Sequence, residues 1–157
     1  MPNGRLVDDY YVVHGPTIVC IFALTEADEV LWVEQYKHGI GQVCWELPAG
    51  MCEGGCADPL AEAQRELLEE TGHQANDWRL LVRTINNPTR YDSYTYLYLA
   101  QGARQIAEQS LDPNEQIVVH RVPLADMPAL LRSGKIEVMS SLGSCWVALD
   151  ALAQLRS

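Results

Sequence analysis

The sequence predicts a single domain of the α/β (α+β) class, in which one mixed β-sheet is sandwiched between α-helices. Segments rich in β-branched and aromatic residues alternate along the chain with segments of helical periodicity. The 157 residues contain no internal repeat, low-complexity stretch or linker, and this length corresponds to about one domain. We therefore expect residues 1–157 to form one folded unit with a substantial core.

The first part of the chain has the composition of strands. Runs of Val, Ile, Thr and Tyr are typical of β-structure. They occupy residues 9–14, 17–24, 30–36 and 44–47. A polar turn at 26–29 predicts that the second and third of these runs form a hairpin.

A long loop and a well-delimited helix follow. Residues 48–57 hold a proline and three glycines and show little periodicity, which predicts a loop. Asp58 is suited to the N-cap, Pro59 to the first helical position, and Gly72 to the C-terminal end. The expected core-facing stripe of this helix is Leu60, Ala63, Leu67 and Thr71.

The second half of the chain alternates between the two kinds of element. Strands are predicted at 78–85, 93–100 and 116–122, with an acidic loop at 112–115 before the last of them. Amphipathic helices are predicted at 124–132 and 139–155. Because strands and helices are mixed along the chain, we expect a mixed sheet with helices on both faces.

Charge and composition exclude some classes of partner. The formal net charge is −10, from 21 acidic and 11 basic residues, so the surface repels polyanions and no duplex nucleic acid is expected as a partner. No apolar run is long enough for a membrane helix. The polar start and the odd count of five cysteines favour a cytoplasmic protein with reduced thiols. Cys52 and Cys56 lack a second pair at zinc-site spacing, so they are expected to be incidental thiols.

The predicted helix after residue 57 carries a group of carboxylates. Glu62, Glu66, Glu69 and Glu70 fall on one flank, beside the apolar stripe. Like charges four residues apart destabilise a helix by a few tenths of a kcal/mol per pair. Carboxylate oxygens grouped in this way suit Mg²⁺ or Mn²⁺, which would convert the repulsion into attraction. The alternative is a solvated acidic helix face with one salt bridge from Arg65 to Glu69.

The context of this helix resembles that of a known family. Residues 46–50 (Glu-Leu-Pro-Ala-Gly), 58–60 (Asp-Pro-Leu) and 65–72 (Arg-Glu-Leu-Leu-Glu-Glu-Thr-Gly) look like the Nudix box and its preceding loop. A proline sixteen residues beyond Gly72, Pro88, is similar to a marker of the subgroup that acts on ADP-ribose and other ADP-sugars. The resemblance extends over most of the chain, from about Val12 onward.

The resemblance implies roles for several residues. Metal ligands would be the carboxylates of Glu66 and Glu70 and the backbone carbonyl of Ala49. Glu69 would assist a further ion or hold Arg65, and Arg65 would orient the glutamates. A glutamate from a late loop binds metal or activates water in the subgroup, and Glu115 is the positional match; its alternative is a solvated turn residue.

The resemblance also implies candidates for substrate binding. Trp45 and Glu46 would contact the nucleoside, although Trp45 is equally suited to the core. Lys37 would neutralise a phosphate as a point charge. Arg90 would contact a phosphate or a ribose, or would be an ordinary solvated loop arginine. Dimerisation through N-terminal strands, usual in the subgroup, implies a homodimer.

The sequence departs from the family pattern in the box. Ala57 stands where a glutamate is usual, and the loop carries one extra residue; Glu53 is a possible substitute carboxylate. His73 stands where an aliphatic residue is usual, and we expect it to be a partly exposed imidazole at the helix end.

We therefore expect a metal-dependent hydrolase of a nucleoside diphosphate linked to another group. ADP-ribose or an ADP-sugar is the favoured substrate, with AMP and a sugar phosphate as products. One alternative is a Nudix enzyme for another nucleotide, such as a GDP-sugar, a dinucleoside polyphosphate, coenzyme A or an oxidised nucleotide. The other is a catalytically weak nucleotide-binding regulatory module, which the loss of a glutamate at Ala57 would favour.

Overall fold

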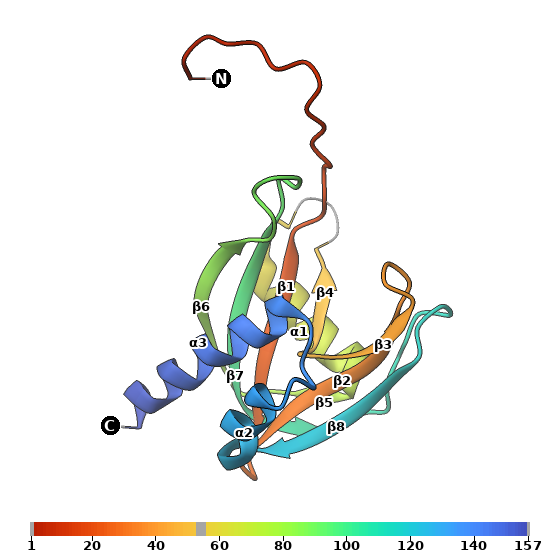
Figure 1. Ribbon diagram of the computed structural model, residues 1–157. Helices are drawn as coiled ribbons and strands as arrows, with labels where there is room; N and C mark the ends of the chain where they lie inside the picture. Colours follow the sequence, from red (N-terminus) through yellow and green to blue (C-terminus); the bar gives the residue numbers. More distant parts are fainter. Residues whose placement is uncertain (1, 53–55, 157) are drawn as a thin grey trace.

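The computed structural model describes residues 2–52 and 56–156 (Figure 1). Its strands are β1 Ile18–Thr25, β2 Glu29–Lys37, β3 Gln42–Glu46, β4 Ala49–Met51, β5 His73–Gln74, β6 Asp77–Ile85, β7 Tyr94–Gln105 and β8 Ile117–Pro123. Its helices are α1 Pro59–Thr71, the 3₁₀ turn η2 Leu124–Asp126, α2 Met127–Arg132 and α3 Met139–Leu155.

The strands form one mixed, eight-stranded sheet. Its main path runs β3-β2-β1-β7-β5, with β4 paired to β1, β6 to β7 and β8 to β2. β1 and β7 are parallel, whereas the other pairs are antiparallel. The predicted hairpin of β1 and β2 is present, with Leu24 opposite Val30.

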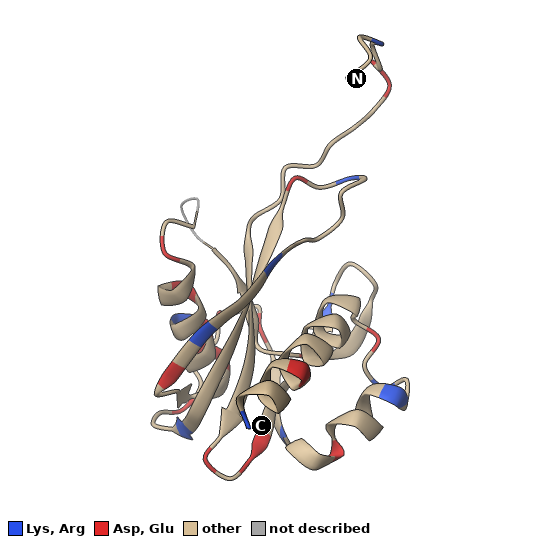
Figure 2. Ribbon diagram, turned by 90° about the vertical axis from the view of Figure 1, so that its left-hand side faces the viewer, with Lys and Arg blue, Asp and Glu red and all other residues tan. Residues whose placement is uncertain are grey.

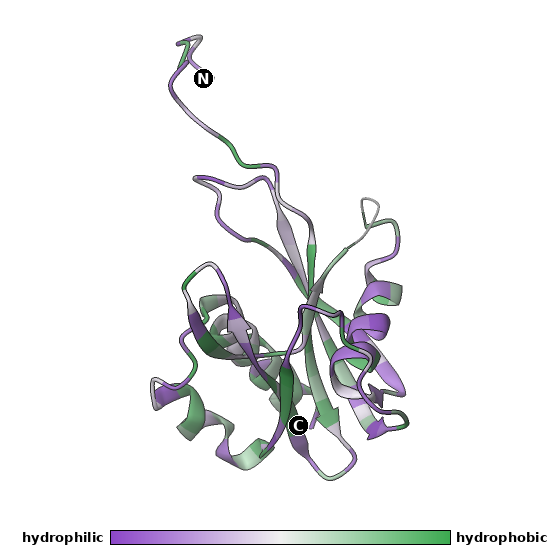
Figure 3. Ribbon diagram, turned by 90° about the vertical axis from the view of Figure 1, so that its right-hand side faces the viewer, coloured by the Kyte–Doolittle hydropathy of each residue, from purple (hydrophilic) through white to green (hydrophobic). Residues whose placement is uncertain are grey.

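The central strand β1 divides its side chains between two cores. Cys20, Phe22 and Leu24 pack in a cluster with residues of α2 and α3, including Met127, Cys145, Ala148 and Leu152. The alternate residues Val19, Ile21 and Ala23 pack with Ala63 and Leu67 of α1. This follows from the two-residue period of a strand, which sends successive side chains to opposite faces. Figure 3 shows the central strands as the most hydrophobic part of the molecule.

Helices therefore cover both faces of the sheet, as the sequence predicts. In Figure 1, α2 and α3 lie in front of the sheet and α1 lies behind it. The predicted stripe of α1 faces its core, since Ala63, Leu67 and Thr71 are buried and Leu60 is partly buried. The predicted helix at 124–132 begins with a 3₁₀ turn before α2. No helix in the described part of the chain is long and apolar enough to cross a membrane.

Two predictions of secondary structure are wrong. Residues 9–14 are extended but form no strand. Their β-pairing is limited to one bridge between Val13 and Tyr91, because the segment beside them, between β6 and β7, is a loop. The predicted loop at 48–57 contains β4, where Ala49 and Gly50 pair with Cys20 and Val19 of β1.

Two predictions about side chains are also corrected. His73 is buried, not partly exposed, because β5 directly follows the helix and inserts the imidazole beside Thr71. Cys52 and Cys56 form a disulfide instead of two reduced thiols, since the loop brings their Cα atoms to 4.9 Å. Cys20, Cys44 and Cys145 are the free thiols among the described residues, and all three are buried. Glu53, considered above as a substitute carboxylate, lies outside the described residues.

Candidate active site

Helix α1 is fixed at both ends by local interactions. The Asp58 side chain accepts hydrogen bonds from the backbone N–H groups of Leu60 and Ala61, each at 3.1 Å. At the other end Gly72 adopts φ +70°, and its N–H donates to the Leu68 carbonyl. A Cβ at Gly72 would lie 2.2 Å from the Ala107 carbonyl oxygen, so a side chain there would collide with backbone. These constraints set the position of the whole acidic flank.

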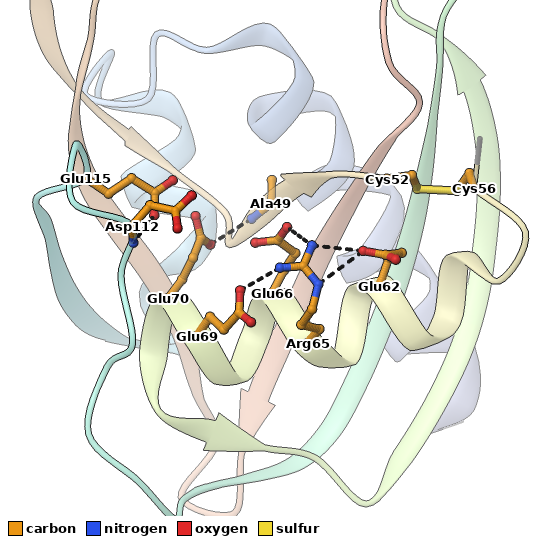
Figure 4. Close-up of polar contacts among 10 residues, drawn as sticks. All are labelled: Ala49, Cys52, Cys56, Glu62, Arg65, Glu66, Glu69, Glu70, Asp112 and Glu115. Atoms are coloured by element: carbon orange, nitrogen blue, oxygen red, sulfur yellow. Dashed lines mark hydrogen bonds and ion pairs between the residues drawn. A yellow bond between two sulfur atoms is a disulfide. The ribbon is translucent and has the colours of Figure 1, made fainter. Parts of the chain in front are cut away.

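Glu70 and Glu66 reach from α1 towards β4 (Figure 4). Glu70 is buried, and its Oε2 accepts a hydrogen bond of 3.0 Å from the Ala49 N–H. Glu66 lies against Gly50, where an added Cβ would come 1.9 Å from the Glu66 carboxyl carbon. The glycine therefore creates the space that the Glu66 carboxylate occupies.

Arg65 holds three carboxylates of α1 together. Its guanidinium lies 2.8 Å from Glu62, 2.7 Å from Glu66 and 2.5 Å from Glu69. The hydrogen bond with Glu62 is the largest cause of the raised pKa of Arg65, so this cation is permanently charged. The family resemblance implies that Arg65 orients the glutamates, and the structure places it in contact with Glu66 and Glu69.

Burial and repulsion shift the ionisation of the two inner carboxyls. Burial is the main cause that raises the pKa of Glu70 to about 8, with further contributions from Glu66 and Glu115. Burial also raises the pKa of Glu66, against the opposing effect of Arg65. At both carboxyls the effect of burial on the pKa outweighs that of the nearby cations, Arg65 at Glu66 and Lys37 at Glu70.

A cavity of about 990 Å³ opens beside these carboxyls. Its lining includes Arg65, Glu66, Glu69 and Glu70 from α1, and also Asp112 and Glu115 from the loop before β8. That loop is tied by a turn, in which the Glu115 carboxylate accepts from the Asp112 N–H at 3.2 Å. Residues far apart in the sequence thus meet at one end of the cavity (Figure 4).

The four predicted substrate-binding residues divide into two groups. Lys37 and Glu46 line the cavity and form an ion pair of 2.6 Å. Trp45 and Arg90 are not among the described residues that line it. Arg90 is exposed in the loop between β6 and β7, where its carbonyl accepts from the Val13 N–H.

Trp45 belongs to a separate cluster. Its ring stacks on His120 with centroids 4.1 Å apart, and the Lys135 ammonium lies 3.3 Å from the centroid of the same ring. Its Nε1 donates to Glu34 Oε2 at 2.7 Å. The indole thus joins β3 and β8 to the segment before α3, a packing role closer to the second interpretation of this residue.

Two parts of the site were not predicted from the sequence. Asp112 was treated only as a member of an acidic loop. The opposite wall of the cavity, made by α3 and the ends of β6 and β7, was not anticipated, because nothing local in the sequence indicates that these elements converge. Its lining residues include Val82, Thr84, Asn86, Met139, Ser140, Gly143 and Val147.

The carboxylate end suits a hard divalent cation. Among the described residues, no three acidic, His or Cys side chains are already gathered as a metal-binding group, which agrees with Arg65 holding Glu66 and Glu69 in its own ion pairs. The chemistry of the donors fits nevertheless: oxygen ligands from Glu66 and Glu70, in a cavity with raised carboxyl pKa values, are the set that Mg²⁺ or Mn²⁺ prefers.

Comparison with known proteins agrees with the fold and the acidic helix. The NUDIX domain family matches residues 14–142, and the chain belongs to this family. The chain is 33% identical over 137 residues to an ADP-ribose pyrophosphatase of Mycobacterium tuberculosis, covering 87% of this chain and 66% of that protein. It is 30% identical to an ADP-ribose pyrophosphatase of Bacillus subtilis, covering 87% of this chain and 73% of that one.

Two further relatives add breadth. A methanol dehydrogenase activator of Bacillus methanolicus is 30% identical over 137 residues, covering 87% of this chain and 73% of that protein. A crystal structure of an ADP compounds hydrolase superposes with a TM-score of 0.79 at 22% identity, covering 90% of this chain and 75% of that one. The chain thus spans about two thirds to three quarters of the length of these proteins. The family and the fold predicted from the sequence are confirmed.

Proposed function

We propose that this protein hydrolyses the pyrophosphate bond of a nucleoside diphosphate linked to a second group, with ADP-ribose or an ADP-sugar as substrate. The single observation that carries the proposal is the cavity in which Glu66, Glu70 and Glu115 meet beside Lys37. The Mycobacterium tuberculosis and Bacillus subtilis relatives, named ADP-ribose pyrophosphatases, support the choice of substrate. The products would be AMP and a sugar phosphate.

The residues take distinct parts in this reaction. Glu66, Glu70 and the Ala49 carbonyl would hold Mg²⁺ or Mn²⁺, which supplies positive charge for the diphosphate and polarises the phosphorus. Arg65 orients Glu66 and also holds Glu69, which would assist a further ion if that ion pair opened. Lys37 would neutralise a phosphate oxygen, and Glu115 would accept the proton of the attacking water.

A binding module without turnover is the second candidate. The observation in its favour is Ala57, which stands where the family box carries a glutamate. The retained Glu66, Glu69 and Glu70 argue against it, because the Glu66–Glu70 repulsion destabilises the helix unless a cation offsets it.

The test is AMP formation from ADP-ribose, with Mg²⁺ present or removed by a chelator. We expect turnover with Mg²⁺ and none with chelator. Glu70→Gln keeps the shape and loses the charge, and we expect it to lower kcat/KM by on the order of 100-fold or more. Folded protein that binds nucleotide but hydrolyses neither ADP-ribose nor GDP-sugars, dinucleoside polyphosphates or coenzyme A would instead establish the binding module.

We further propose that the protein is a cytoplasmic homodimer. The dimer is supported by the extended N-terminal arm, residues 2–17, which projects away from the sheet and exposes 81% of Leu6 and 77% of Tyr11 (Figure 1). For the cytoplasmic location the cysteines give opposite indications: Cys20, Cys44 and Cys145 are free thiols, whereas a disulfide such as Cys52–Cys56 is rare in a reducing compartment.

A further inference from the structure

One face of α3 carries a gap in the wall of the cavity. Met139, Gly143 and Val147 follow one another at four-residue intervals, so they lie on the same side of the helix, roughly 6 Å apart along its axis. All three line the cavity. The two flanking side chains therefore border a notch at Gly143, where the helix has no side chain.

Packing within the protein does not explain this glycine. A Cβ built at Gly143 would meet no heavy atom of the described residues within 4 Å, and the residue does not adopt a positive φ. Glycine in the middle of a helix costs roughly 0.5–1 kcal/mol relative to alanine. The space that the missing side chain leaves open belongs to the cavity.

The large side chains that border the notch are apolar and exposed, and Ser140 and Ser144 of α3 also line the cavity. Ile85 at the end of β6 is 56% exposed, Met139 74% and Val147 42%. Ile18, Val82 and Leu97 extend this lining across the sheet. α3 itself carries one charged residue, Asp150, in contrast to the charged turns of α1 (Figure 2). Three large apolar side chains from two elements thus converge on open space, which marks a binding groove.

A fixed polar group stands at the edge of this groove. The Asn86 amide, which lines the cavity, donates to Ser93 Oγ at 3.0 Å, and its Oδ1 accepts a hydrogen bond from Thr95. Ser93 and Thr95 are both only 5% exposed, so the network is anchored in the protein. An amide retains one further proton and one further lone pair after these bonds, and Asn86 is itself exposed.

We propose that the groove between α3 and the ends of β6 and β7 binds the nucleobase of the substrate, with Gly143 admitting the ring and Asn86 contacting its polar edge. This inference rests on the proposed function and specifies which end of the substrate lies where. The ring would stack on apolar walls, and an amide pairs well with the donor and acceptor edge of a base such as adenine.

The charges of the cavity fix this orientation. Among the described lining residues, the cationic side chains are Lys37 and Arg65, and both are ion-paired at the carboxylate end. A phosphate therefore has its partners at that end, and the uncharged apolar end suits the base. A sugar phosphate in the groove would have no cationic side chain of the described lining residues beside it.

The test replaces the open space by a side chain. Gly143→Leu fills the notch with a good helix former, so folding is expected to be retained. Gly39→Leu is the matched control, because Gly39 is also exposed, has an open Cβ direction and lies outside the cavity. Adenosine, which has no phosphate, is titrated into isotopically labelled protein in the presence of chelator, and amide chemical shifts are followed; thermal unfolding checks the fold of each variant.

We expect adenosine to shift the amides of α3 and of the β6 end, and its affinity to fall roughly tenfold or more in Gly143→Leu but not in Gly39→Leu. The KM for ADP-ribose should rise by a similar factor in Gly143→Leu with kcat little changed. Gly143→Ala, with a smaller side chain, should lie between the two. A smaller change in Asn86→Ala would support the contact with the base edge.

Other outcomes overturn the assignment or locate the failure. Three results would each overturn the assignment of the nucleobase to this groove. They are equal adenosine affinity in the wild type and Gly143→Leu, chemical-shift changes centred on Trp45, and absence of adenosine binding to the wild type. Adenosine binding that Gly143→Leu abolishes, with no nucleotide hydrolysed, would overturn the proposed hydrolase activity alone. If Gly143→Leu fails to fold, Gly143→Ala decides by the same comparison.

Discussion

At Gly50 the absence of one carbon atom determines the position of a carboxylate. β4 brings this residue alongside Glu66, so the two share a volume that only one of them can fill. Nothing in the sequence around Gly50 explains why this residue is a glycine. The reason is steric, and it involves residues from different elements.

Gly50→Ala is expected to lower kcat/KM for ADP-ribose at least tenfold. The new Cβ would lie 2.0 Å from Glu66 Oε1, and the flexible carboxyl end must move away from the cavity wall. Because only a side-chain terminus moves, the midpoint of thermal unfolding should change little. Gly39→Ala is the control, since it adds the same atom in open space. Unchanged kinetics in Gly50→Ala would show that the position of Glu66 is not critical.

The ionisation of Glu70 makes the metal-free protein sensitive to pH. Folding raises the pKa of this carboxyl from 4.5 to about 8. A group of this kind contributes stability that is complete below pH 4.5 and is lost as the pH rises through about 8. In chelator, the unfolding free energy of the wild type should therefore fall relative to that of Glu70→Gln between pH 5 and 8.

Denaturant unfolding of both proteins at several pH values measures this difference. Saturating Mg²⁺ should cancel the loss, because a bound cation favours the charged carboxylate. Unfolding free energies that run parallel from pH 5 to pH 8 in chelator would contradict the burial of an ionisable Glu70.

On the scale of elements, the ends of α1 determine where its carboxylates lie. Asp58→Ala removes the acceptor of two N–H groups and should cost about 1 kcal/mol of stability. For a chain of this size, that lowers the unfolding midpoint by roughly 2–4 °C. Calorimetry measures the shift, and Asp58→Asn, which keeps an oxygen acceptor, should recover most of it. Activity at 25 °C should stay near that of the wild type, because Asp58 does not line the cavity.

Elements with local signals were predictable, and elements that depend on distant partners were not. Asp58, Pro59 and Gly72 delimit α1 in the sequence because caps act on neighbouring residues. The wrong prediction for residues 9–14 has the opposite cause, since a strand needs a partner and a loop is what lies there. His73 was expected to be partly exposed because its burial depends on β5 and on Arg121, 48 residues away.

The site shows the same division. The carboxylates of α1 could be placed from helical periodicity alone, and Glu115 only by resemblance. The apolar wall could not be predicted, because α3 packs against β6, which lies more than fifty residues earlier in the sequence. The residues next to Gly143 in the sequence also give no reason for a glycine there. An aromatic residue such as Trp45 is of a type that often contacts ligands, yet its ring is already in contact with the Lys135 ammonium and the His120 ring.

On the scale of the whole molecule, the N-terminal arm carries apolar and aromatic side chains that the rest of the fold leaves exposed to solvent. Tyr10, Tyr11, Val12 and Val13 are all more than 40% exposed. If the arm joins two copies, replacing Leu6, Tyr10 and Tyr11 together by serine should shift the protein from dimer to monomer in analytical ultracentrifugation. The unfolding of the sheet should be unaffected. A wild type that is monomeric at micromolar concentration would refute the dimer directly.

The parallel pairing of β1 with β7 also has a consequence for synthesis of the chain. Ile18 of β1 pairs with Thr95 of β7, so one edge of β1 stays unpaired until a residue 77 positions later in the chain (95 − 18) has been synthesised. At roughly 5–20 residues per second, the ribosome takes roughly 4–15 seconds to deliver it. During that interval the hairpin of β1 and β2 exposes an open strand edge and two apolar faces. Newly made chains should therefore depend on chaperones until β7 has left the ribosome.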